Sequence, residues 1–145
     1  MKWIYDDGGR EKAGYQGKAG DCACRAIAIV TGLPYQEVYD EINHYGENYE
    51  RTGKRKRGKS NARTGVYKSC VKNIMERYGY VWHPTMLIGQ GCKVHLKKDE
   101  LPMGRILCNV SKHYVAVVDG VIYDTHDPSR NGNRCVYGYY MKRGE

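Results

Sequence analysis

The order of residue patterns along the chain predicts an α+β fold, with N-terminal helices packed on a C-terminal antiparallel sheet. Apolar residues recur at helical spacing in the first half of the 145-residue chain. Short runs rich in β-branched residues and tyrosine fill the second half. Helices followed by strands are typical of this class. The length suits one domain spanning residues 1–145, which is large enough to bury a core without disulfides.

Three helices are predicted in the first half of the chain. Asp21 is a good N-cap for a helix over 22–31, which ends before a glycine. Pro34 suits the first position of a second helix that runs to about residue 43. A third helix is expected over about 65–77, where apolar residues recur at helical spacing and a glycine follows.

The strand predictions begin with a short strand before residue 20, anchored by Trp3 and Tyr5. Asp119-Gly120 separates two β-rich runs, which is a strong signal for a two-residue hairpin. In that hairpin Val118 pairs with Val121. The strands expected in the second half cover residues 80–82, 93–96, 105–110, 114–118, 121–124 and 134–141.

This hairpin register brings a histidine and a carboxylate together. Alternation along the strands puts His113 and Asp124 on one face as diagonal neighbours. A carboxylate there can accept the imidazole N–H, fix its tautomer and orient the other ring nitrogen. Asp127 falls on the opposite face and precedes a proline, so it is interpreted as a turn residue. A bulge or a one-residue slip would exchange the two aspartates.

Cys22 is the candidate nucleophile. A thiol attacks a carbonyl carbon as the thiolate, and a helix N-terminus or a nearby histidine lowers its pKa. Cys24 lies about 200° further around the same helix and is expected to pack in the core. His113 is the candidate base, and His126 would replace it if the hairpin shifted.

No disulfide or metal site is predicted for the remaining cysteines. No apolar run follows the first charges of the chain, so no secretion signal is predicted and the six cysteines are expected to be reduced thiols in a cytoplasmic protein. Cys22-Ala23-Cys24 has no second close pair to complete a zinc site, and no metal or cofactor is expected. No stretch approaches the roughly 18 apolar residues of a membrane span, so no membrane contact is expected.

A basic exposed loop is predicted at about residues 46–65. It accounts for most of the net charge of +8 and is expected to contact nucleic acid or an acidic partner, or to be merely solvated. No aromatic residue interleaves with the charges, so base stacking is not supported. The basic residues are Arg51, Lys54, Arg55, Lys56, Arg57, Lys59 and Arg63.

Gln16 lies six residues before Cys22, where a side-chain amide could stabilise negative charge on an attacked carbonyl oxygen. In order and rough spacing, Gln16, Cys22, His113 and Asp124 resemble the papain-like cysteine peptidases, especially their compact bacterial and phage forms. The resemblance implies a papain-like fold, a Cys-His-Asp triad, Gln16 in the oxyanion hole and a peptide or protein substrate. Ala23 departs from the family's tryptophan after the cysteine, and the chain is far shorter than papain.

The predicted function is therefore a thiol-dependent hydrolase that cleaves an amide or a related acyl bond. Two alternatives stay open at this point. The same three residues could transfer the acyl group to an amine, because transfer and hydrolysis need the same thiolate and imidazole. The chain could also be a non-catalytic module that binds protein or nucleic acid on the same fold.

Overall fold

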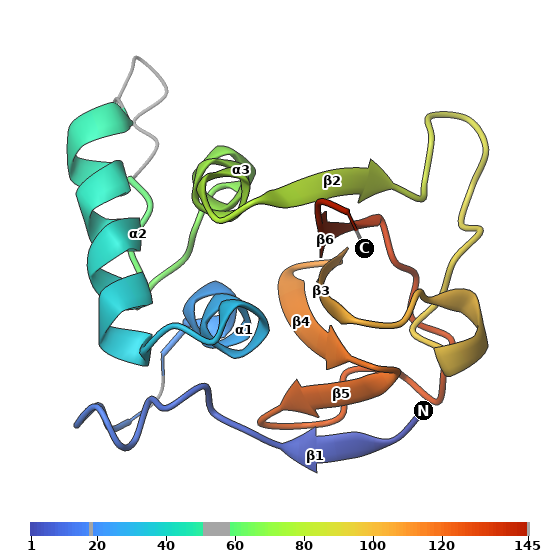
Figure 1. The fold of residues 1–145 in the computed structure, drawn as a ribbon, viewed down its shortest axis with the longest axis horizontal. Coiled ribbons are helices and arrows are strands. Elements are labelled where there is room, and N and C mark those ends of the chain that lie inside the picture. Colours follow the sequence, from blue (N-terminus) through green and yellow to red (C-terminus); the bar gives the residue numbers. More distant parts are fainter. Residues whose placement is uncertain (18, 51–58, 145) are drawn as a thin grey trace.

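The computed structural model describes residues 1–17, 19–50 and 59–144. Within them, helices α1 (Cys22–Thr31) and α3 (Lys68–Arg77) pack on a six-stranded sheet, and helix α2 (Tyr35–Tyr49) packs across both helices (Figure 1). This arrangement confirms the α+β class. No helix in the described part of the chain is long and apolar enough to cross a membrane.

The sheet is mixed rather than antiparallel throughout. Its strand order is β1-β5-β4-β3-β6-β2, and β1 runs parallel to β5 while the other neighbours are antiparallel. The expectation of an antiparallel sheet is wrong at this edge, because the N-terminal strand returns beside a strand from the far end of the sequence. The strands are β1 (Trp3–Tyr5), β2 (Tyr80–Pro84), β3 (Arg105–Val110), β4 (His113–Val118), β5 (Val121–Asp124) and β6 (Gly138–Lys142).

The β4–β5 hairpin has the predicted register. Val118 pairs with Val121 and Val117 pairs with Ile122. The turn residue Asp119 has φ 49° and the following glycine has φ 78°, and two consecutive positive φ angles are those of a type I′ hairpin turn. The turn chemistry thus fixes where β5 ends, and with it the position of Asp124.

Helix α2 is longer than predicted, because it continues to Tyr49 rather than ending near residue 43. Gly46 permits close packing there, since a Cβ atom at this position would lie 2.0 Å from the carbonyl oxygen of Ser60. The Glu50 carboxylate accepts hydrogen bonds from the Ser60 backbone N–H and from its hydroxyl, the latter at 2.6 Å. Residues 46–49 are therefore helical and Ser60 is buried, so the prediction of an exposed loop over 46–65 is wrong for these residues.

The segment 93–96 is not a strand. Its one ladder contact is an isolated antiparallel bridge between His95 and Cys135. A 3₁₀ helix, η1 (Lys98–Glu100), follows it. Strand β6 correspondingly begins at Gly138 rather than at residue 134. Helix α3 begins at Lys68, slightly later than expected.

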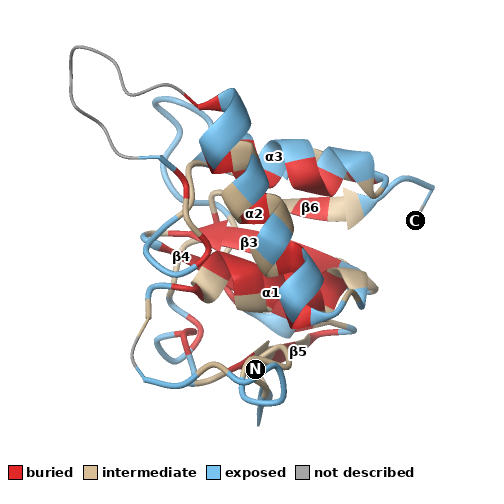
Figure 2. Ribbon diagram, turned by 90° about the vertical axis from the view of Figure 1, so that its left-hand side faces the viewer, coloured by how far each residue is buried: buried red, intermediate tan, exposed pale blue. Residues whose placement is uncertain are grey.

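Two buried clusters hold the layers together. One lies between the helices and the sheet and includes Ile27, Ile74 and Leu107, while the other lies on the opposite face of the sheet and includes Val115 and Ile122. Figure 2 shows that buried residues predominate along α1, the helix that packs on β4. Because α1 is this deep, its first turn lies against the start of β4.

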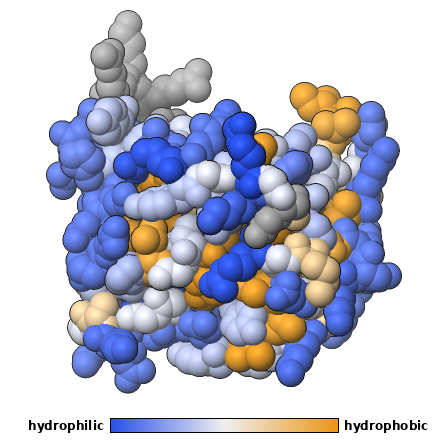
Figure 3. All heavy atoms as spheres, in the orientation of Figure 1, coloured by the Kyte–Doolittle hydropathy of each residue, from blue (hydrophilic) through white to orange (hydrophobic). Residues whose placement is uncertain are grey.

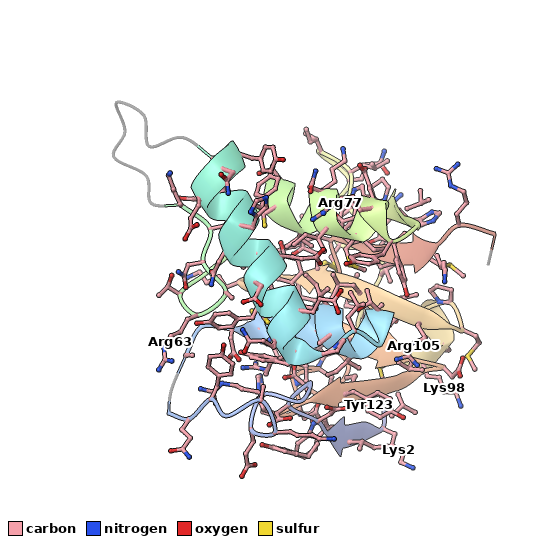
Figure 4. All side chains as sticks on the ribbon, turned by 60° about the vertical axis from the view of Figure 1, so that its left-hand side comes forward. Lys2, Arg63, Arg77, Lys98, Arg105 and Tyr123 are labelled. Carbon is pink, nitrogen blue, oxygen red and sulfur yellow. A yellow bond between two sulfur atoms is a disulfide. The ribbon has the colours of Figure 1, made fainter. Side chains whose placement is uncertain are left out.

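The two ends of α1 are tied to other elements. At the C-terminal end, the Arg105 guanidinium donates a hydrogen bond of 2.8 Å to the carbonyl oxygen of Val30. At the N-terminal end, Gly20 N–H donates to the carbonyl oxygen of Arg63 at 2.7 Å. Figure 4 shows Arg63 and Arg105 at these opposite ends. The position of the first turn of α1 is thereby fixed relative to the sheet.

Candidate active site

Cys22 and His113 meet where α1 begins beside the start of β4. Cys22 is the first residue of α1 and is half-buried. His113 is the first residue of β4 and is buried, with its backbone paired to Val110 of β3. The two side chains line the same pocket, and the interaction with His113 is the largest one that lowers the pKa of Cys22. The structure therefore joins two groups that are 91 positions apart in the sequence.

Asp124 holds the other side of the His113 ring. His113 Nε2 lies 2.7 Å from Asp124 Oδ2, and both side chains are buried. With Nε2 engaged by the carboxylate, Nδ1 is the ring nitrogen available to the sulfur of Cys22. The second carboxylate oxygen, Oδ1, accepts a 2.7 Å hydrogen bond from the Thr125 backbone N–H. Cys22, His113 and Asp124 thus lie in the order that a catalytic triad requires.

The two competing residues take other places. Asp127 is exposed and accepts a hydrogen bond of 2.9 Å from the Ser129 backbone N–H, which is the turn role predicted for it. His126 is 56% exposed in its side chain, and its Nδ1 lies 3.9 Å from Asp124 Oδ1. The hairpin has not shifted, so His113 rather than His126 faces the cysteine.

The backbone around Asp124 is held by the N-terminal strand. The Trp3 indole N–H and the Asp6 backbone N–H each donate a hydrogen bond of 3.0 Å to the carbonyl oxygen of Asp124. Strand β1 also pairs Tyr5 directly with Asp124. The position of the carboxylate therefore depends on residues at the start of the chain.

Arg25 and Asp21 form a supporting ion network that the sequence analysis missed. Asp21 is the N-cap residue of α1, as predicted, but its side chain makes no capping hydrogen bond. Its buried carboxylate instead pairs with Arg25, with Arg10 at 3.2 Å and with the Tyr35 hydroxyl at 2.7 Å. The other terminal nitrogen of Arg25 lies 3.7 Å from Asp124 Oδ1. A largely enclosed positive charge, 13% exposed in its side chain, thereby faces the Asp124 carboxylate.

Part of this network left a signal in the sequence. Asp21 and Arg25 are four residues apart at a helix start, a spacing at which opposite charges pair. Arg10 and Asp124 reach the pair only through the tertiary fold, and no local pattern marks them.

The surroundings of Cys22 favour its thiolate. Burial alone would raise its pKa, but the hydrogen bond and the charge of His113 oppose burial. A hydrogen bond from the Tyr114 backbone and the charge of Arg25 act in the same direction, and the pKa of Cys22 ends below its usual value.

The pKa values of His113 and Asp124 move apart. Burial lowers the pKa of His113, but the hydrogen bond that the ring donates to Asp124, followed by the interactions with Cys22, outweighs burial and raises that pKa to about 9. Burial would raise the pKa of Asp124, and the hydrogen bond and charge of His113 reverse this and hold it below its usual value. These directions favour the thiolate of Cys22, the imidazolium of His113 and the carboxylate of Asp124 over their uncharged or neutral forms.

The other cysteines differ from Cys22. Burial raises the pKa of Cys24 to about 12 and that of Cys70 to about 12, and it also raises the pKa of Cys108. Cys24 is fully buried, which confirms its predicted place in the core. The remaining two cysteines, Cys92 and Cys135, form a disulfide with Cα atoms 5.9 Å apart, so the prediction of six reduced thiols is wrong for this pair. They are brought together by the His95–Cys135 bridge, which no local pattern marks.

A pocket of about 400 Å³ opens beside the thiol. Cys22 and His113 line it, together with Gly20, Thr64 and Asn109. Lys68 and Lys112 also line it and are exposed, so the rim of the pocket is positively charged.

Gln16 lies in a different pocket, of about 300 Å³, which Arg10, Arg25 and Thr125 also line. Its side chain is exposed. The preceding residue is fixed, because the Tyr15 hydroxyl donates to Gln36 Oε1 at 2.6 Å and the Tyr15 ring stacks on Tyr39. The role of Gln16 as oxyanion donor stays a prediction.

Most of the predicted basic contact surface lies outside the described residues, namely Arg51, Lys54, Arg55, Lys56 and Arg57. Lys59 and Arg63 are described and exposed. The Lys59 ammonium donates to the carbonyl oxygen of Glu47 at 3.3 Å. A partner for this surface stays a prediction.

His113, Asp124 and His126 offer ligand atoms that lie within 4.8 Å of one another, a spacing that a metal ion could bridge. Nε2 of His113 already contacts Asp124, and its other nitrogen faces Cys22. A metal ion bound there would compete with the interactions that lower the pKa of the thiol.

No family model, curated protein or solved structure matched this chain in the three comparisons.

Proposed function

We propose that this protein is a thiol-dependent hydrolase of papain-like architecture, which cleaves an amide or a related acyl bond through Cys22, His113 and Asp124. The observation that carries the proposal is geometric: Cys22 and His113 line one pocket, and His113 Nε2 lies 2.7 Å from the buried carboxylate of Asp124. A cysteine with only a structural role gains nothing from this arrangement. The other free cysteines among the described residues have raised pKa values, as such a role predicts.

The reaction begins with the ion pair. The Cys22 thiolate attacks the carbonyl carbon of a substrate seated in the pocket, and the carbonyl oxygen becomes negatively charged. The Cys22 backbone N–H is in the first turn of α1, where N–H groups lack partners within the helix and can donate to this oxygen. His113 then protonates the leaving amine, and the acyl group remains on the sulfur as a thioester.

The second half of the reaction restores the enzyme. Neutral His113 takes a proton from a water molecule, which attacks the thioester carbonyl. The carboxylic acid leaves and Cys22 returns to the thiolate, with the proton on His113. Asp124 keeps the ring oriented and stabilises its positive charge in both halves. Gln16 lines a different pocket from Cys22, so the described geometry supports the Cys22 backbone N–H as the oxyanion donor and leaves the predicted role of Gln16 without support.

Acyl transfer to an amine would use the same thiolate and the same imidazole. The two outcomes differ only in the molecule that attacks the thioester. Release of a free acid from a simple ester substrate indicates hydrolysis, and an amide product formed with added amine indicates transfer.

The first prediction concerns the rate of thiol labelling. At neutral pH, iodoacetamide should modify Cys22 at least tenfold faster than Cys24, Cys70 or Cys108, because only Cys22 has a lowered pKa and a route to solvent. His113→Ala should slow this labelling by about tenfold or more, since it removes the largest interaction that lowers the pKa of the thiol. Peptide mass spectrometry after timed exposure measures each site.

His83→Ala is the matched control. His83 is exposed and stacks on Tyr139, away from Cys22, so its loss should leave the labelling rate unchanged. Equal labelling of all free cysteines in the native protein would contradict the proposed function.

A further inference from the structure

We propose that Cys92, His95 and Cys135 form a zinc site when their disulfide is reduced, remote from the pocket beside Cys22. None of these three residues lines that pocket. The site would alternate between two closed forms, a disulfide under oxidising conditions and a zinc ion held by two thiolates and an imidazole under reducing ones.

The backbone places two of the ligands opposite each other. His95 and Cys135 are partners in an antiparallel bridge. The flanking hydrogen bonds run from Leu96 N–H to the carbonyl oxygen of Arg134 at 2.9 Å and from Val136 N–H to that of Val94 at 2.8 Å. This pattern marks a non-hydrogen-bonded pair, whose side chains share one face and lie closest. Leu96 and Val136 are fully buried, so the bridge is anchored in the core.

The third ligand and the support of the histidine are already in position. Cys92 Sγ lies 3.6 Å from His95 Nε2. On the other side of the ring, His95 Nδ1 lies 3.2 Å from Glu100 Oε1, in η1. A histidine that binds zinc through one nitrogen commonly donates its other N–H to a carboxylate in this manner. Glu100 thus presents Nε2 to the two sulfurs.

The ligand set suits zinc. Two thiolates and one imidazole are ligands that zinc prefers, with a fourth tetrahedral position left for water or another side chain. Met86 Sδ lies 3.8 Å from Cys135 Sγ, so a thioether borders the two cysteine sulfurs. Met86 is held there by its backbone N–H, which donates to the carbonyl oxygen of Tyr137 at 3.2 Å.

An incoming ion can reach the site. Cys92 and Met86 are exposed, and they lie in the connection between β2 and β3. Figure 3 shows hydrophobic surface on the part of this connection that projects from the molecule, where Leu87 and Ile88 are also exposed. Two thiolates bound to one zinc ion are about 3.7 Å apart at tetrahedral geometry. Rotation about the two Cα–Cβ bonds can separate the sulfurs to that distance.

Electrons and protons are conserved when the disulfide form is converted to the zinc form. A cellular dithiol gives two electrons and two protons to the Cys92–Cys135 disulfide and itself becomes a disulfide. One zinc ion then displaces the two thiol protons and binds both sulfurs. Oxidation reverses the sequence and releases the ion.

The experiment uses the full chain with Cys22→Ser, so that the proposed catalytic thiol cannot contribute and the result is independent of the proposed function. The disulfide is reduced with a phosphine, which takes up the oxygen of one water molecule, and the phosphine is removed. The reduced protein should bind one zinc ion per chain, and the oxidised protein should bind none at this site. Cobalt(II) in place of zinc should give the near-ultraviolet thiolate charge-transfer absorption of a tetrahedral site.

Two variants and one control variant locate the ion. His95→Ala should weaken zinc binding by a hundredfold or more, and Glu100→Gln by about 10–100-fold. His126→Ala removes a histidine of the other possible metal cluster, and it should leave zinc binding unchanged. Absence of zinc or cobalt binding by the reduced chain, or equal affinity in the His95→Ala variant, would overturn the proposal.

Discussion

Cys22 has its properties because of its neighbours, and those neighbours were predictable to different degrees. His113 and Asp124 could be paired from the sequence, because a two-residue turn fixes the register of one hairpin and the spacing along it. The approach of Cys22 to that hairpin came from a family resemblance, since no local rule links residues so far apart. Arg25 and Arg10 were missed because their charges act through contacts that only the tertiary fold creates.

A pH profile tests the charge state of the pair. The Cys22 pKa is lowered, so iodoacetamide labelling should persist below the usual thiol range and fall only when acid protonates the thiolate. Hydrolysis also needs the proton on His113, whose pKa is raised to about 9, and should therefore fall again as the pH rises through about 9. Labelling, which needs no proton donor, should not fall there.

The variant Asp124→Asn tests whether the alkaline limb of this profile comes from His113. Asp124 provides the largest interaction that raises the pKa of His113, so the alkaline limb of hydrolysis should move to lower pH in the variant. Asp127→Asn, at the exposed turn, should leave the limb in place. An alkaline limb at the same pH in Asp124→Asn as in the parent protein would show that the carboxylate does not act on the imidazole.

Among the helices and strands, sequence patterns predicted the bounds well where the pairing partner is close in the sequence. They failed where the partner is far away. Strand β3 and the β4–β5 hairpin have nearly the predicted bounds. Helix α2 was predicted too short, because Gly46 favours a helix end and only the close backbone of Ser60 explains why a glycine lies inside. The segment 93–96 has a strand-like composition, yet its partner is a single residue 40 positions away.

Gly46→Ala tests that packing. Alanine forms helix better than glycine by about 1 kcal/mol, so propensity alone predicts a more stable protein. The added methyl group would lie 2.0 Å from a backbone carbonyl oxygen, which cannot move as a side chain does. The variant should therefore unfold more easily by about 1–3 kcal/mol, as for overpacked cores, measured by denaturant titration.

Glu47→Ala serves as the comparison, because Glu47 is exposed on the same helix and its substitution should change stability by less than about 0.5 kcal/mol. A Gly46→Ala variant more stable than the parent would mean that α2 and the segment at Ser60 lie further apart than described.

For the whole molecule, the sequence predicted the fold class and the order of layers but not the charge network that joins them. Arg25 extends from α1 to Asp21 and to Asp124 of β5, so one guanidinium connects the helical layer with the strand beside edge strand β1. Its side chain is 13% exposed and the two carboxylates are buried. A buried ion pair that loses one partner leaves an uncompensated charge.

Arg25→Ala should therefore lower the free energy of unfolding by about 3–5 kcal/mol, measured by denaturant titration. Arg63→Ala removes an exposed arginine and should have little effect. An Arg25→Ala variant as stable as the Arg63→Ala variant would show that Arg10 alone neutralises Asp21.

The three residues of strand β1 help to fix the position of Asp124. It is an edge strand of the sheet and is exposed, and its Trp3 indole N–H donates a hydrogen bond to the backbone carbonyl oxygen of Asp124. Deleting residues 1–5 would remove the hydrogen bond from the Trp3 indole and the pairing of Tyr5 with Asp124, so the rate of Cys22 labelling should fall.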